Sequence, residues 1–213
     1  MVTDLKKKHR ELRDNESSTL ALRLHRAISW LTKADQSDDL DSQFIFLWIA
    51  FNAAYSQETG LTHLSDGNKF RKFLQRIVEL DDKQMIQKQL WDDFSQAIRV
   101  LLDNKYVYQP FWNHHNGLDG YEDWQKRFTK AKKVAQLALM KKDTATLLNI
   151  IFNRLYTLRN QIMHGGSTWN SQTNRQQLKD ATNILSQIVP IIAEIMMDHP
   201  SQVWGEACYP VVK

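Results

Sequence analysis

The chain has 213 residues, of which 42% are hydrophobic and 24% charged, a composition that is typical of a folded protein with a substantial core and excludes a disordered one. No apolar run reaches the roughly 18 residues that a membrane span requires, the N-terminus lacks the apolar core of a secretion signal, and the single cysteine, Cys208, can form no internal disulfide. We therefore expect a cytoplasmic protein without a membrane span, whose formal net charge of +4 is mild but unevenly distributed.

Strand and turn signals are scarce, because the chain has only seven glycines and four prolines and almost no alternation of apolar and polar residues. This predicts an all-α protein, an antiparallel helical bundle. A flexible segment is expected over 1–16, one helical domain over 17–200 with an irregular insert over 103–121, and a tail over 201–213. The helices are expected over 17–33, 40–57, 68–79, 82–102, 121–141, 143–164 and 173–198.

The segment QFIFLWIAFNAAYS, residues 43–56, is apolar on nearly every side, which predicts a helix inside the bundle rather than on its surface. Asn52 is then a buried polar side chain. Such an amide either ties neighbouring helices together by hydrogen bonds or supports a functional site nearby, and the sequence favours neither interpretation.

The insert is rich in aromatic residues and contains two adjacent histidines, His114 and His115. The histidines do not present a helical ligand pair, and no cysteine cluster or metal-binding spacing accompanies them, so we expect no metal ion. A glycine-rich phosphate loop is lacking as well, and no cofactor is expected. The rings can stack on nucleic acid bases or fold back over a core, and packing is favoured because aromatic side chains tend to be buried; they include Tyr106, Tyr108, Phe111 and Trp112.

The stretch from Trp124 to Lys142 contains seven basic residues and no acidic one. Lys126, Lys130 and Lys133 recur at spacings of four and three residues, so they form a stripe on one face of the helix expected over 121–141. Such a stripe can hold an RNA backbone by releasing counterions, or it is simply a solvated lysine face.

The helix expected over 143–164, with Asp143 as its N-cap, carries apolar residues on two faces. The first set recurs at spacings of three and four residues and predicts a stripe that faces the bundle: Leu147, Ile151, Leu155, Leu158 and Ile162. The second set lies about 100° around the helix axis and predicts a second partner, either another helix or another subunit: Leu148, Phe152, Tyr156 and Met163.

Three polar residues, Arg159, Asn160 and His164, stand at the end of this helix before a pair of glycines. An arginine forks onto phosphate oxygens, and a histidine takes or gives a proton near neutral pH. Together they can cleave RNA without a metal, with Asn160 orienting the imidazole or contacting the substrate. The alternative is that both cations bind the last carbonyls of the helix, where positive charge is favoured.

The motif RNQIMH followed by GG resembles the signature of the HEPN superfamily, an arginine and a histidine separated by four to six residues with a polar residue after the arginine. The upstream LWIAFNAAY is similar to the tryptophan and asparagine pattern in the inner helix of several HEPN groups, particularly those of the ApeA-like kind. The resemblance implies a helical bundle, a homodimer with a shared cleft and a metal-independent endoribonuclease, with Arg159 and His164 as the catalytic pair and Asn160 as the supporting residue.

The same resemblance implies a role as a toxin or phage-defence effector, with RNA as substrate and an antitoxin or another defence protein as a possible partner. Some HEPN proteins bind nucleotides or proteins and do not cut. The leading hypothesis is therefore an endoribonuclease, and the competing one is a noncatalytic helical interaction module.

Overall fold

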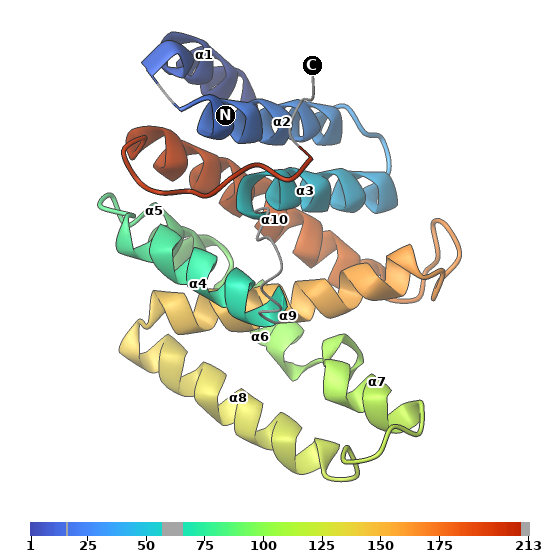
Figure 1. Ribbon diagram of the computed structural model, residues 1–213. Helices are drawn as coiled ribbons and strands as arrows, with labels where there is room; N and C mark the ends of the chain where they lie inside the picture. The colour runs from blue at the N-terminus through green and yellow to red at the C-terminus, as the bar shows by residue number, and fades with distance from the viewer. Residues whose placement is uncertain (16, 57–65, 210–213) are drawn as a thin grey trace. The chain divides into compact units, whose positions relative to one another are not determined.

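The computed structural model describes residues 1–15, 17–56 and 66–209, and its regular elements in these ranges are helices (Figure 1). The predicted all-α class is therefore confirmed. The chain divides into two compact units, unit 1 with residues 1–83 and 182–213 and unit 2 with residues 84–181, where the sequence predicts one helical domain. Among the described helices, none combines the length and the apolar character that crossing a bilayer requires.

Unit 1 is built from helices that enclose an aliphatic and aromatic core. Its central pair is α2 (Ser18–Asp35) and α3 (Leu40–Tyr55), and no residue of α3 is exposed, in agreement with its predicted inner position. The side chain of Asp39 caps α3 by accepting a hydrogen bond from the Ser42 amide at 2.9 Å. The other helices are α1 (Val2–Leu12), α4 (Asp66–Glu79) and the larger part of α10 (Arg175–Asp198), which begins in unit 2 and continues through Pro190.

Helix α1 and a short 3₁₀ turn, Arg13–Asn15, occupy the segment that the sequence predicts to be flexible. The helix forms because Leu5 and His9, four residues apart, are 3% and 6% exposed and so supply a narrow buried stripe. On another face Lys8 binds Asp198 of α10, with Nζ 2.5 Å from Oδ1. The sequence predicts a flexible segment because most residues here are charged and the buried stripe contains only two residues.

The tail after α10 also packs against unit 1. Trp204 and Ala207 are 5% and 3% exposed. Arg23 of α2, 1% exposed, donates hydrogen bonds to the carbonyls of Trp204 and Ala54 and, at 3.1 Å, to that of Gly205. Backbone carbonyls from two distant segments thus converge on one buried guanidinium.

Unit 2 contains more helices than the sequence predicts. The helix expected over 82–102 is broken into α5 (Met85–Lys88), a π-helical turn (Gln89–Asp93) and α6 (Ser95–Asp103). The insert, expected to be irregular over 103–121, contains a 3₁₀ turn, η3 (Lys105–Val107), and α7 (Gln109–His115), which starts with a proline in its first turn. The prediction missed both breaks and α7 because these pieces are too short to show periodicity.

The longest helices of unit 2 are α8 (Trp124–Lys141) and α9 (Thr144–Met163), which a tight turn joins. Lys142 adopts the left-handed conformation at φ 54°, and the Asp143 side chain accepts a hydrogen bond from the Thr146 amide at 3.0 Å, as the predicted N-cap. Figure 1 shows the two helices diverging from this turn, with α7 near their far ends.

Candidate functional site

Helix α9 presents one buried face and one face that changes character along its length. Leu147, Ile151, Leu155 and Leu158 are each at most 1% exposed, so the first predicted stripe is core except at its last member, Ile162, which is half-buried. On the second face Leu148 and Phe152 are fully buried. Tyr156 and Met163, at 44% and 51% exposed, bring apolar surface to the outside near the C-terminal end of the helix.

The end of α9 is a Schellman motif that requires both glycines. The Gly165 amide donates to the Ile162 carbonyl at 3.1 Å, the Gly166 amide donates to the Gln161 carbonyl at 2.7 Å, and Gly165 has φ 71°. A Cβ on Gly166 would lie 2.9 Å from the Gln161 oxygen. The glycines therefore end the helix directly after His164, and the backbone itself satisfies these two carbonyls.

The polar residues on this helix end do not all join one another. Arg159 is half-buried, and its Nη1 donates to Oδ1 of Asn160 at 3.0 Å. Its Nε is buried and has no hydrogen-bond partner among the described residues. His164 is exposed, and within the described part of the chain its side chain makes no hydrogen bond.

In this structure the Asn160 side chain accepts a hydrogen bond from the arginine, and its expected roles, orienting the imidazole or contacting the substrate, stay predictions. Among the described residues, neither Arg159 nor His164 donates a side-chain hydrogen bond to the last carbonyls of the helix, which was the alternative interpretation. The guanidinium keeps Nη2 for another partner, whereas its Nε is buried, and the imidazole faces solvent one turn further along α9.

The charge of this region is one-sided. From Thr144 to Lys179 the sequence contains no aspartate and no glutamate. Arg159 is therefore a cation without a nearby carboxylate on its own helix or on the loop that follows. Such a surrounding favours an anionic ligand at the end of α9.

Arg154, which the sequence analysis did not single out, fixes the aromatic insert to α8 and α9. It is 3% exposed, and its guanidinium carbon lies 4.3 Å from the ring centroid of Tyr108 and 5.3 Å from that of Phe128. Burial lowers the pKa of Arg154 to about 10, an effect that Tyr108 opposes. The sequence did contain a signal for this contact, a lone arginine within an apolar helix pattern. A buried guanidinium needs aromatic faces or hydrogen-bond acceptors, so such an arginine predicts them nearby.

The insert is also tied to the site itself. Gln161, next to Asn160, donates from Nε2 to the Tyr106 carbonyl at 2.5 Å, and Trp112 donates to the same carbonyl at 2.7 Å. Phe111 contacts Trp124 of α8 with 5.0 Å between ring centroids. The rings of the insert thus contact one another and α8, which is the packing interpretation, although Tyr106 remains 44% exposed.

The three lysines of α8 form an exposed stripe, as their spacing predicts: Lys126, Lys130 and Lys133. They line a shallow surface groove of about 410 Å³. Two neighbouring cations are paired, Arg127 with Asp123 and Lys132 with Asp103, each at 2.6 Å, whereas the stripe has no ion pair among the described residues. Its positive charge is therefore uncompensated.

Asn52 lies on α3 of unit 1, half-buried rather than fully buried as the sequence predicts. Its backbone carbonyl accepts the hydrogen bond from Ser56 that ends the helix, at 2.8 Å. The suggested role of its side chain in supporting a site stays a prediction.

Comparison of the whole chain with known protein families, with curated proteins and with solved structures found no match.

Proposed function

We propose that this protein is a metal-independent endoribonuclease of the HEPN type, in which Arg159 and His164 act on a phosphodiester of RNA. The observation that supports the proposal most is the end of α9. It carries a half-buried arginine oriented by Asn160 and, one turn later, an exposed histidine, in a stretch without acidic residues. Arginine for charge and histidine for protons are the two functions that RNA cleavage requires.

The reaction is an internal displacement at phosphorus. The ribose 2′-oxygen loses its proton and attacks the neighbouring phosphorus, forming a P–O2′ bond while the P–O5′ bond breaks. The products are a 2′,3′-cyclic phosphate and a 5′-hydroxyl, which takes up one proton. His164 performs one of these proton transfers, and the Nη2 group of Arg159 stabilises the charge on the phosphorane-like transition state.

One histidine cannot act on both oxygens at the same moment, so the proposal includes a second copy of the chain that contributes its own His164. The exposed Tyr156 and Met163 lie on α9 close to the motif and supply apolar surface for such a dimer. The lysine stripe of α8 contributes to binding the RNA backbone away from the cleavage point.

The direct test is cleavage of a defined RNA by the purified protein in excess chelator. We expect His164→Ala and Arg159→Ala each to reduce the cleavage rate at least about 100-fold, the usual contribution of a proton-transfer or charge-stabilising residue. The matched controls are His114→Ala and Arg99→Ala, which remove an exposed histidine and an exposed arginine elsewhere in unit 2. Cleavage that survives in both motif variants moves the active site elsewhere.

The dimer is tested separately with Met163→Asp, which places a charge on the exposed apolar face without changing the catalytic pair. Light scattering should show a wild-type dimer and a mostly monomeric variant, and the loss of cleavage should follow the loss of the dimer. A fully active monomer contradicts the shared cleft.

The same exposed apolar surface favours a second candidate, a noncatalytic interaction module. In that case the chain binds RNA, nucleotide or protein without cutting. Fluorescence anisotropy with a labelled RNA distinguishes the two candidates: binding with no cyclic phosphate product in any condition indicates the module.

A further inference from the structure

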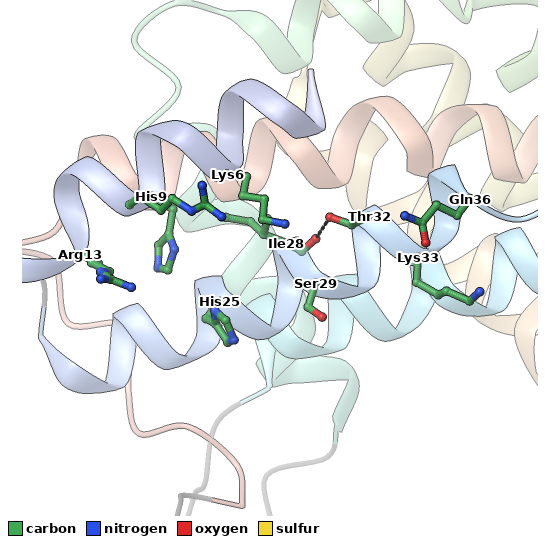
Figure 2. A pocket seen from close by; sticks show the side chains of 10 residues that line it. Lys6, His9, Arg13, His25, Ile28, Ser29, Thr32, Lys33 and Gln36 are labelled. Carbon is green, nitrogen blue, oxygen red and sulfur yellow. Dashed lines mark hydrogen bonds between the residues drawn. The ribbon is translucent and has the colours of Figure 1, made fainter.

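A second charged surface lies in unit 1, between α1 and α2 (Figure 2). It is a groove of about 490 Å³ that belongs to neither the α9 motif nor the lysine stripe. The 3₁₀ turn after α1 contributes one residue, Arg13. This volume is within the range of small-molecule sites and exceeds what a single phosphate ion fills.

Cations on α1 and on the turn after it face one side of the groove because of their spacing. Lys6, Arg10 and Arg13 recur at four and three residues and so share a face. Figure 2 shows His9 pointing from α1 toward α2 and Lys6 extending in the direction of Thr32.

The opposite side is formed by α2, which offers a histidine, a hydroxyl group and one more cation. His25, Ser29 and Lys33 line it, and they recur at intervals of four residues. Among the described residues that line the groove there is no carboxylate. The nearest ion pair at its edge is weak, because Asp14, whose side chain is 89% exposed, lies 3.7 Å from Nε of Arg13.

Packed helices usually place opposite charges on the flanks of their contact, whereas the described residues of α1, its following turn and α2 bring four cations and two histidines together. The pKa of His9 at the floor of the groove is lowered, first by burial, against a hydrogen bond with the Ala21 carbonyl, and further by His25 and Arg13. The groove therefore disfavours added positive charge and favours an anion.

We propose that the groove between α1 and α2 binds a short chain of phosphate groups. Two guanidiniums can fork onto phosphate oxygens, while Lys6 supplies a point charge and Ser29 a hydroxyl donor. The described lining residues include no aromatic ring other than the two imidazoles, and Ile28 is the one aliphatic side chain among them, so they offer a nucleobase no stacking partner. Recognition then resides in the phosphates, whether they belong to free oligophosphate or to a nucleoside triphosphate.

The test is calorimetric titration of the full chain with inorganic tripolyphosphate, ATP and orthophosphate at matched ionic strength. Tripolyphosphate should bind with a single site and orthophosphate far more weakly. The double variant Arg10→Gln with Arg13→Gln should weaken binding about tenfold or more, since it removes both guanidinium forks. Both positions are exposed, so folding is not at risk.

The matched control removes two equally exposed cations of unit 1 that do not line the groove, Lys7→Gln with Lys72→Gln, and should change the affinity less than about twofold. Equal affinity for ATP and tripolyphosphate shows that the chain of phosphates is read without the base. Binding of tripolyphosphate alone identifies free oligophosphate as the ligand. Both results support the proposal.

Histidine NMR locates the ligand. An anion in the groove should raise the pKa of His9, and this effect should disappear in the arginine double variant. Three results overturn the proposal: no binding of tripolyphosphate or ATP by the wild type, equal weakening in the control variant, or an unchanged pKa of His9 at saturation. Because the groove lies in unit 1, none of these results bears on the cleavage proposed for Arg159 and His164.

Discussion

The buried Arg23 should be the strongest single attachment of the C-terminal tail to unit 1, and Arg23→Met tests this. The arginine donates to three carbonyls, those of Trp204, Gly205 and Ala54. Hydrogen bonds from a charged donor contribute about 1.5–3 kcal/mol each, or about 4.5–9 kcal/mol for three. Methionine fills a similar volume and removes all of them.

An opposing effect reduces this figure. Burial lowers the pKa of Arg23 from the ordinary value of an arginine to about 10, against a smaller effect of Cys208. At about 1.4 kcal/mol per pH unit, the charged form is disfavoured by about 3 kcal/mol, and the substitution relieves this penalty. The difference leaves a destabilisation of about 2–6 kcal/mol, and with 3 kcal/mol as a working value the melting temperature should fall by about 6–12 °C.

The matched control is Arg26→Met, on the same helix and against the same tail. Arg26 donates to the carbonyls of Cys208 and Tyr209, both at 2.7 Å, but it is half-buried. Water can replace its bonds, so a loss below about 1 kcal/mol is expected.

Urea unfolding followed by circular dichroism gives the free energies, and hydrogen exchange with mass spectrometry reports on the amides of residues 201–209. Arg23→Met should accelerate exchange in that segment far more than Arg26→Met does. The reasoning is refuted if the two variants lose similar free energy of unfolding. It is also refuted if the amides of residues 201–209 stay protected from hydrogen exchange in Arg23→Met.

Three further predictions concern the helix end, the lysine stripe and an acidic residue of unit 1. Gly166→Ala should destabilise the end of α9 by about 1–2 kcal/mol, because its Cβ meets a backbone carbonyl, and hydrogen exchange at His164 should increase; unchanged exchange refutes the steric argument. Replacing the lysine stripe by glutamine should reduce the salt dependence of RNA binding by about two in the logarithmic slope, measured by anisotropy, whereas an unchanged slope identifies a solvated face. Burial alone would raise the pKa of Asp198, but hydrogen bonds from Lys8 and Lys83 hold it below 3.8. This contribution to stability is present above about pH 4 and is lost as the pH falls. In Asp198→Asn the free energy of unfolding should therefore decrease less steeply below about pH 5 than in the wild type. An equally steep decrease in the variant and the wild type contradicts this prediction.

Long periodic segments were predictable because helix formation depends on neighbours within four residues. The expectations over 17–33, 40–57, 121–141 and 143–164 agree with α2, α3, α8 and α9 to within about three residues at either end. Asp143 was predictable as a cap for the same local reason. Short elements were not: α1 has too few apolar residues, and the break between α5 and α6 occurs within a continuous helical pattern.

The sequence by itself determined the helical class, the two-faced character of α9, and the occurrence of Arg159 and His164 within its last two turns. Only the tertiary structure decided which groups are buried. Arg23 binds the carbonyl of Trp204, which lies 181 residues away in the chain, and Arg154 of α9 stacks on the ring of Tyr108 in the insert. The physical reason is the range of the interactions. Backbone hydrogen bonds within a helix are encoded locally, whereas burial and hydrogen-bond partners depend on which distant surfaces the folded chain brings into contact.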